Sequence, residues 1–473
     1  MSDLLIVFIG LAIILYIFFV LGTSRTAILK GYSGLLWFIF SLILPPISYL
    51  IILNKARKDK PAEQKASFFD GIVMELTQPF VDLAHTSRAL LGVNLSYVLE
   101  GLTYFGVVGL LAIFFNEYIG LNDIDAGRMV GILTAGITIA MLFLGATVDW
   151  IGLRKSLLIS LSLMLVGRVF LTISPEIGVP GLWGSAHIFA MLGIFGIILG
   201  YGIYQPACYA GVKQLTNEKT AAMGYAMLYA LMNLGGFLPG IISPPVRKAF
   251  GIPGVFWVYA ALTVVGIGIV YFIITKKAME KALSDANRDA DGNQKAAEKD
   301  DMAGLSSKEK FAYYIRNFPL KDLRFLYFVF ILIFVQTLFA HNWLTIPQYT
   351  SRAFQGQTYF GIPNFIDDNF EFFVNLNPIL IFILTPMVTA LTSKKDTYNM
   401  MIIGTFVMAS PTFILALGPN LYTLLAYITL MTVGEAMWQP RFLQWVAEIA
   451  PKNMTGIYMG IGQFPWFLTK VIT

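Results

Sequence analysis

The sequence predicts an all-α polytopic membrane protein whose core helices form two bundles, of six and at least five helices, preceded by an N-terminal transmembrane hairpin. Three observations lead to this fold class. Hydrophobic residues make up 57% of the 473 residues and charged residues only 13%, whereas soluble domains carry about 25% charged residues. The mean hydropathy is +0.69. Apolar segments of about 20 residues, long enough to cross a bilayer, recur along the whole chain.

The hairpin is expected within residues 1–60, from the apolar segments Leu4–Leu21 and Leu35–Leu53. The first segment differs from a cleaved signal peptide, because it lacks a basic start and its apolar stretch is too long. We therefore predict a retained helix. Residues 61–91 follow as an amphipathic stretch that is too interrupted to span, and we expect them to lie along the cytoplasmic surface of the membrane.

Two blocks of apolar segments, residues 92–275 and 322–473, are predicted to form the bundles. Residues 276–321 between them are rich in charged and polar residues, a composition that cannot form a buried core, so we expect a hydrophilic cytoplasmic linker. The second block stops before the last helix of a six-helix half; this indicates a fragment or a truncated fold. The predicted core helices are Val93–Tyr118, Val130–Val148, Leu157–Thr172, Ile188–Gly211, Ala221–Ile242, Val255–Ile274, Phe325–Leu344, Phe373–Leu391, Met400–Leu417, Leu421–Val446 and Gly456–Ile472.

The orientation follows from the lysine and arginine residues in the short loops, which favour the cytoplasmic side. Their distribution places the N-terminus in the cytoplasm and Thr473 at the outer face. Four cations, Arg25, Lys30, Arg247 and Lys248, fall on the opposite side and weaken the contrast. The loops assigned to the cytoplasm carry Arg57, Lys58, Arg154, Lys155, Lys213, Lys219, Lys276, Lys277, Lys394, Lys395 and Lys452, and the opposite loops carry Asp123, Asp125, Glu176, Asp367, Asp368 and Glu371.

A loop motif follows the second core helix, with the sequence Gly145-Ala-Thr-Val-Asp149-Trp-Ile-Gly152-Leu-Arg154-Lys155. Gly145 permits close helix packing, Asp149 stands at a helix end, Gly152 permits a tight turn, and the two cations anchor the cytoplasmic side. An ordinary charged turn is the alternative. With the two-block layout, this motif resembles the signature loop of the major facilitator superfamily.

Further patches resemble the proton-dependent oligopeptide transporter (POT/PTR) family of that superfamily. They extend from about Leu91 to the C-terminus, and their order and spacing match the family. The patches are Glu100-Gly-Leu-Thr-Tyr104-Phe105-Gly106, which resembles the end of the ExxERFxYYG signature, Asn233-Leu-Gly-Gly, Asn375-Leu-Asn377-Pro378, Gly434-Glu435-Ala-Met-Trp-Gln-Pro440, and Ala450-Pro451 with Gly456 and Met459-Gly460.

The departures from the family pattern fall on its charged positions. Tyr97 stands where the signature has its first glutamate, and Gly101 stands where it has arginine. Gln205 occupies the place of a lysine before Pro206, so Glu435 lacks the cationic partner that the resemblance implies. The proton-coupling circuit of the family is therefore incomplete in this sequence.

Two carboxylates within apolar helices, Glu100 and Glu435, are the best site candidates. An ionised group at the bilayer centre costs at least about 2.5–3.5 kcal/mol, so it faces a wet cavity, pairs or takes up a proton. One lies in each block, which suits a proton- and substrate-binding site between two bundles. Hydrogen bonding between helices is the alternative.

Other polar side chains are predicted to line the same cavity, since amides and tyrosines bind peptide-like groups without adding charge; interhelical packing is the equal alternative. Arg168 could snorkel or supply a substitute cation. Arg441 and Glu448 are expected at a solvated helix end or a gate, and the remaining aromatic residues are expected to face lipid and its interfaces. The predicted lining residues are Tyr104, Tyr204, Gln205, Asn233 and Asn377.

The resemblance implies a secondary active transporter in a bacterial cytoplasmic membrane, coupled to protons and specific for small peptides or peptide-like solutes. The alternative is a transport-inactive subunit that scaffolds a larger membrane complex, with protein partners bound through the N-terminal hairpin. The single Cys208 excludes disulfides and cysteine-based metal sites. No catalytic motif and no clustered basic face is present, so we expect no enzyme activity, cofactor or nucleic acid.

Overall fold

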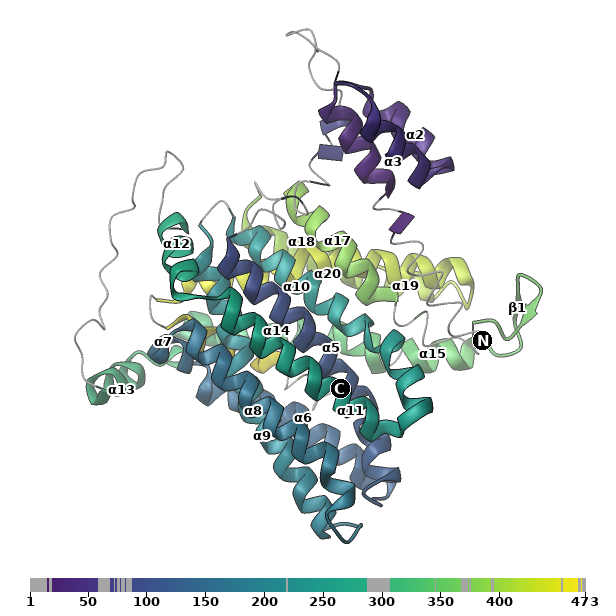
Figure 1. Cartoon of the computed structure of the whole chain (residues 1–473). Coiled ribbons are helices and arrows are strands. Elements are labelled where there is room, and N and C mark those ends of the chain that lie inside the picture. Colours follow the sequence, from purple (N-terminus) through teal and green to yellow (C-terminus); the bar gives the residue numbers. More distant parts are fainter. Residues whose placement is uncertain are drawn as a thin grey trace. The chain divides into compact units, whose positions relative to one another are not determined.

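The described residues of the computed structural model are mainly helical, and the chain forms two compact units (Figure 1). Unit 1 comprises Met1–Thr86 with Pro386–Lys394, and unit 2 comprises Ser87–Thr385 with Lys395–Thr473. The predicted linker 61–91 lies mostly outside the described residues, as do Lys58, Lys219, Lys394, Lys452, Asp367, Asp368 and Glu371. The structure describes residues 15–16, 19–57, 69–71, 73–74, 77, 81, 87–217, 220–286, 307–344, 346–366, 373, 376–392, 395–451, 454–466 and 469.

The six predicted helices of the first block are all present in unit 2. α5 packs against α6, α10 and α11, and α8 packs along α9. α11 is kinked at Gly251, whose φ of +68° lies outside the helical range. The bounds are α5 (Arg88–Glu117), α6 (Asp123–Leu144), α7 (Thr147–Ile151), α8 (Leu153–Ile173), α9 (Ser185–Leu215), α10 (Ala221–Phe237) and α11 (Pro239–Ile273).

The second block has the predicted helices, with one difference. The expected helix Met400–Leu417 is divided into α18 and α19 at Ser410–Pro411, because proline has no N–H to continue the helical hydrogen bonds. The last predicted segment, Gly456–Ile472, is helical up to Gly462 as α21, and much of its remainder lies outside the described residues. The bounds are α14 (Leu323–Leu344), α17 (Leu376–Thr392), α18 (Thr397–Ala409), α19 (Thr412–Leu415), α20 (Leu421–Ile449) and α21 (Thr455–Gly462).

Seven helices among the described residues are long and apolar enough to cross a membrane. They are α5, α6, α8 with the short turn after it, α9, the part of α11 from Val246, α18 with α19, and α20. The fold class predicted from composition, an all-α polytopic membrane protein, is therefore confirmed.

Small residues let the core helices approach closely, as the α8–α9 contact shows. A Cβ atom at Gly167 would lie 2.5 Å from the carbonyl oxygen of Gly193, and a Cβ atom at Gly193 would lie 2.6 Å from that of Gly167. Backbone-to-backbone packing of this kind is typical of membrane helices, where van der Waals contact drives association.

The linker is more ordered than its composition predicts. α12 (Lys276–Ala286) and α13 (Ser307–Arg316) occupy its two ends, and residues 287–306 lie outside the described part. α12 packs against α5 and α9, and its Ala282 is buried. The overall composition of residues 276–321 does not reveal that these two short helices each have an apolar and a charged face. The loop before α17 adds α15 (Ile346–Ala353) and an antiparallel pair, β1 (Thr358–Tyr359) and β2 (Ile362–Pro363).

Unit 1 contains a helix over Phe19–Leu29, followed by α2 (Gly34–Ile43) and α3 (Pro45–Asn54). The prediction of one continuous helix over Leu35–Leu53 is wrong. Leu44 interrupts it with φ −135° and ψ 66°, because a residue before proline is disfavoured in the helical region. α2 and α3 contact each other and form a hairpin.

Candidate functional site

Glu100 on α5 is fully enclosed by helices of the first bundle. Its carboxylate forms a bidentate ion pair with Arg168 of α8, in which Nη1 lies 3.0 Å from Oε2 and Nη2 donates to Oε1. Arg168 Nη1 also contacts Oγ1 of Thr263 on α11. The exposed fraction is 2% for Glu100 and 1% for Arg168. Arg168 therefore does not snorkel: it is the cation that neutralises Glu100.

Gly101 occupies the position at which the family signature has arginine. It lies where α5 meets α10. A Cβ atom at Gly101 would approach the carbonyl oxygen of Met232 to 3.1 Å and the Cα atom of Gly235 to 3.4 Å. A large side chain cannot fit in this contact without separating the helices. Gly101 therefore supports close packing, and the positive charge next to Glu100 comes from another helix.

Glu435 on α20 joins the two bundles. Its Oε1 accepts a hydrogen bond from the hydroxyl of Tyr229 on α10, and its Oε2 accepts one from Nδ2 of Asn377 on α17 at 2.7 Å. Asn377 Nδ2 also lies 3.1 Å from Oγ1 of Thr432. The structure thus brings the predicted Glu435 and Asn377 together, with Tyr229 of the first bundle as the third member.

The groups that contact the Glu435 carboxylate are polar but uncharged. The residue is 4% exposed, and the ion pairs of the described residues, Arg128–Asp125 and Arg168–Glu100, do not include it. A carboxylate at this place has two neutral donors and no counter-charge within the described part of the chain. A buried charge without a counter-charge is costly.

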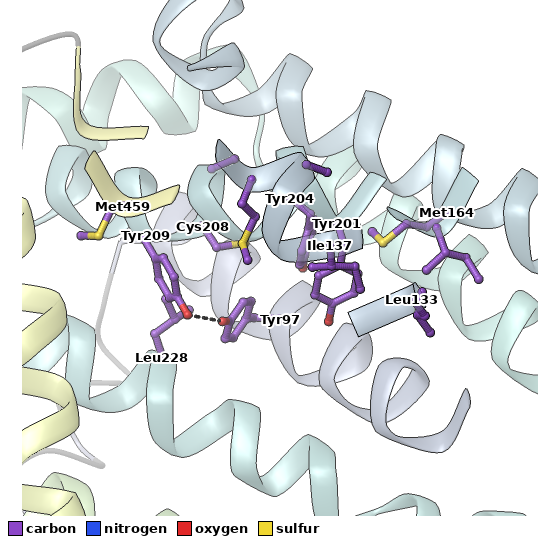
Figure 2. Close-up of a cluster of buried hydrophobic side chains, with 14 of the residues drawn as sticks. Tyr97, Leu133, Ile137, Met164, Tyr201, Tyr204, Cys208, Tyr209, Leu228 and Met459 are labelled. Atoms are coloured by element: carbon purple, nitrogen blue, oxygen red, sulfur yellow. Dashed lines mark hydrogen bonds between the residues drawn. The ribbon is translucent and has the colours of Figure 1, made fainter. Parts of the chain in front are cut away.

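Tyrosines fill the region between α5 and α9 (Figure 2). Figure 2 shows the hydroxyl groups of Tyr97 and Tyr209 directed toward one another, 3.3 Å apart. Gln205 Nε2 donates to the Tyr209 hydroxyl at 2.8 Å, and the Tyr204 hydroxyl donates to Oγ of Ser96 at 3.0 Å. Of the predicted lining residues, Tyr204 and Gln205 therefore belong to a polar network within the first bundle.

Two further predicted lining residues, Tyr104 and Asn233, are half-buried. The ring of Tyr104 lies 4.8 Å from that of Tyr201, centroid to centroid. Asn233 Nδ2 donates to the carbonyl oxygen of Tyr229, one turn earlier on α10, at 3.0 Å. Asn233 therefore lies next to the residue that contacts Glu435, while Tyr104 lies in the aromatic packing of the first bundle.

The signature loop contacts the second bundle through Asp149. Its carboxylate accepts the backbone N–H of Gly456, at the start of α21, with a distance of 3.1 Å to Oδ2. A Cβ atom at Gly145 would lie 2.8 Å from the carbonyl oxygen of Gly456. Gly145 and Asp149 thus both approach Gly456 at the start of α21, while Asp149 itself lies within the short α7.

The remaining residues of the loop stay within the first bundle. Gly152 has φ +82°, the left-handed backbone that favours glycine. Arg154 donates from Nη2 to the carbonyl oxygen of Tyr271 at 3.2 Å, and its guanidinium lies 5.3 Å from the centroid of that ring. Lys155 is exposed.

Further polar contacts lie at the same ends of the helices. Lys213 of α9 donates to the carbonyl oxygen of Ala450, after α20, at 2.8 Å. Arg441 is 3% exposed and donates to Gln444, which donates to Glu448. The expectation of a solvated Arg441 is therefore wrong, because the helices of unit 2 enclose it.

Sequence reasoning identified Tyr104 and Tyr204 but missed three other buried or contacting tyrosines. Those expected to face lipid include Tyr97 and Tyr209, which are 2% and 6% exposed, and Tyr229, which contacts Glu435. The spacing of Tyr229 and Asn233 places both on one face of α10, and this signal could have identified Tyr229. The contact between Arg168 and Glu100, 68 residues apart, has no comparable local signal.

Long apolar helices in two bundles that contact each other through buried polar groups define an integral membrane protein. The family model described as the Major Facilitator Superfamily matches residues 93–472. The chain therefore belongs to the Major Facilitator Superfamily, and its functional class is secondary transport. A search of curated protein sequences gives no match.

Solved structures support the same fold and the resemblance to the POT family. A bacterial homologue of the human drug peptide transporters PepT1 and PepT2 has a TM-score of 0.54 and 17% identity, covering 81% of this chain and 88% of its own. A POT family transporter in complex with 5-aminolevulinic acid has a TM-score of 0.54 and 16% identity, covering 82% and 89%. The proton:xylose symporter XylE has a TM-score of 0.53 and 16% identity, covering 81% and 87%.

Proposed function

We propose that this protein is a proton-coupled transporter of small peptides or peptide-like solutes, in which Glu435 binds the coupled proton. The observation that carries the proposal is the contact of Glu435 with Tyr229 of the first bundle and Asn377 of the second. Alternating access requires the bundles to separate. Separation breaks the bond to Tyr229, whereas the bond to Asn377 stays within the second bundle.

The proton and the conformation are linked through the burial of this carboxyl group. In the closed contact Glu435 is enclosed without a counter-charge among the described residues, so the neutral acid is the more stable form there. When the bundles part, water reaches the carboxyl group and the charged form is no longer costly. Release of the proton then accompanies opening, and its binding accompanies closure.

The peptide-like substrate class rests on the sequence patches that resemble the oligopeptide transporters and on polar groups in both bundles. A peptide carries amides and opposite terminal charges. Asn233 offers an amide group one turn from Tyr229, and Asn377 offers one at Glu435. Two of the similar structures are transporters of the peptide transporter group.

Uptake of a labelled dipeptide into proteoliposomes tests the proposal. We expect an outward-acidic pH gradient to drive accumulation in the wild type. Glu435→Gln should reduce accumulation to the level of protein-free vesicles and keep peptide counterflow, because a permanent amide forms the contact but carries no proton. Glu117→Gln, an exposed carboxyl group at the end of α5, is the matched control. Gradient-driven accumulation by Glu435→Gln equal to that of the wild type would contradict the proposal.

A transport-inactive scaffold is the second candidate. The observation that favours it is the exposed apolar surface of α2 and α3, where Leu36 and Ile43 of α2 are 68% and 73% exposed and Leu50 of α3 is 59% exposed. This candidate predicts a stable complex with other membrane proteins in mild detergent and no peptide flux in either the gradient or the counterflow assay.

A further inference from the structure

We propose that the α2–α3 hairpin of unit 1 is re-entrant: it enters the membrane from one face, turns at Leu44–Pro45 within the bilayer, and returns to the same face. The acyl chains of one leaflet are its binding partner. This inference is independent of the transport proposal, because it rests on contacts within unit 1 alone.

The length of the two helices fits one leaflet. α2 and α3 contain 10 residues each, which corresponds to about 15 Å per helix at 1.5 Å per residue. The hydrocarbon core of a bilayer is about 30 Å thick. Each helix therefore reaches about the bilayer centre, and Leu44 at the turn lies at the deepest point.

The base of the hairpin gives the strongest evidence, because residues before α2 contact residues after α3. Lys30 Nζ donates to the carbonyl oxygens of Leu53 and Lys55 at 2.6 and 2.8 Å. The Tyr32 hydroxyl donates to the carbonyl oxygen of Ala56 at 3.0 Å. A segment that crossed the membrane would place these residues about 30 Å apart on opposite faces, so the contacts require a return to the starting face.

The base of the hairpin is cationic and aromatic, like proteins at the membrane surface, and its tip is apolar, like proteins in the membrane interior. At the base, the Lys55 ammonium lies 5.3 Å from the Tyr32 ring and 5.7 Å from the Trp37 ring, and lysine with aromatic rings is typical of the head-group region. At the tip, Ile43 and Leu44 are 73% and 41% exposed. An apolar tip with a cationic, aromatic base fits a lipid leaflet.

Several polar groups of the hairpin have partners within unit 1, as the bilayer interior favours. At the turn, the Leu44 N–H donates to the carbonyl oxygen of Phe40 at 3.3 Å, and the Ser48 N–H donates to that of Leu44 at 2.9 Å. Ser24 donates to the carbonyl oxygen of Gly34 at 2.8 Å. Proline at the start of α3 has no N–H to satisfy, so the break does not add an orphan donor there.

The re-entrant path also accounts for two misplaced cations. With two spanning segments, Arg25 and Lys30 fall on the face opposite Arg57 and contradict the positive-inside rule. With a re-entrant hairpin, Lys30 and Arg57 lie on one face, which fits the rule. If the predicted first segment Leu4–Leu21 crosses the membrane, the chain starts on the face opposite Lys30, the reverse of the orientation predicted from two spans.

Labelling with a membrane-impermeant maleimide tests this topology in right-side-out and inverted vesicles. Single cysteines are introduced at Ser33 and Ala56 at the base and at Leu44 at the tip, all exposed in the structure. The wild type, whose single Cys208 is buried, gives the background, and a monodisperse elution profile verifies that each variant folds.

We expect Ser33→Cys and Ala56→Cys to react in the same vesicle orientation. Leu44→Cys should react in neither orientation and become reactive only after detergent is added. Labelling of the two base positions from opposite faces would overturn the proposal, as would labelling at neither. Reaction of Leu44→Cys in intact vesicles would show that the tip is in water and not in lipid.

Discussion

At the scale of single residues, the ion pair of Glu100 with Arg168 shows how a charged position can move between helices. The oligopeptide transporter signature places arginine next to the glutamate on the same helix. Here Gly101 occupies that position in the tight α5–α10 contact, and Arg168 reaches Glu100 from α8. The charges stay balanced although the sequence motif is broken.

A double-mutant cycle on this pair measures its role in stability. Glu100→Gln or Arg168→Met alone leaves an uncompensated buried charge, and we expect each to destabilise the protein by about 3–5 kcal/mol. The double variant should be less destabilised than either single variant, since neither charge remains. Unfolding in detergent, followed by tryptophan fluorescence, provides the free energies. Additive effects of the two substitutions would contradict the bidentate pair.

The sequence identified several residues of the site correctly, but it did not predict which residues contact them. Glu100 and Glu435 stand out because a carboxylate within an apolar helix is rare, and Asn377 was identified from a family patch. Their contacts depend on which helices become neighbours, and this information is spread over hundreds of residues. Arg168 had two open interpretations for that reason, and Tyr229 was grouped with aromatic residues at the lipid surface.

At the scale of helices, the approach of α5 and α10 depends on Gly235. A Cβ atom there would lie 2.6 Å from the carbonyl oxygen of Val98 and 2.9 Å from the backbone nitrogen of Leu102. Gly109, also on α5, is exposed and has no atom within 4 Å of a built Cβ. Comparing substitutions at the two glycines therefore separates the effect of the helix contact on stability from the effect of replacing glycine within a helix.

Alanine substitution of these two glycines should give opposite results. We expect Gly235→Ala to lower the free energy of unfolding by about 1–3 kcal/mol, because an added methyl group overpacks a backbone contact. Gly109→Ala should leave it unchanged or raise it slightly, since alanine is the better helix former. Thermal unfolding of both variants in the same detergent compares them, and equal destabilisation would rule out the close contact.

The helices themselves were largely predictable because spanning segments are long and continuous in the sequence. The continuous helix predicted over Leu35–Leu53 is wrong because Pro45 divides it, whereas Met400–Leu417 remains one candidate span with a turn at Pro411. The amphipathic α12 was missed because its charged face dominates its composition, although Ala282 on the other face is buried.

At the scale of the whole transporter core, the two bundles of unit 2 meet in three polar contacts at two levels along the helices. Glu435 contacts Tyr229 within the helices, while Asp149 contacts Gly456 and Lys213 contacts the carbonyl oxygen of Ala450 at the predicted cytoplasmic ends. The last two contacts join the bundles at the predicted cytoplasmic ends. Since closure buries Glu435, a change in its charge should change the balance between closed and open forms.

The distance between spin labels on the two bundles, measured at two pH values, tests this coupling most directly. Labels at Lys155→Cys and Ile449→Cys, both exposed, report on the predicted cytoplasmic ends. We expect the short-distance population to increase from pH 8 to pH 5, because a neutral Glu435 is easier to bury. Glu435→Gln should show the short distance at both pH values. A distribution of spin-label distances that does not change with pH in the wild type would contradict the proposed role of Glu435. A pH-dependent distribution that persists in Glu435→Gln would contradict it as well.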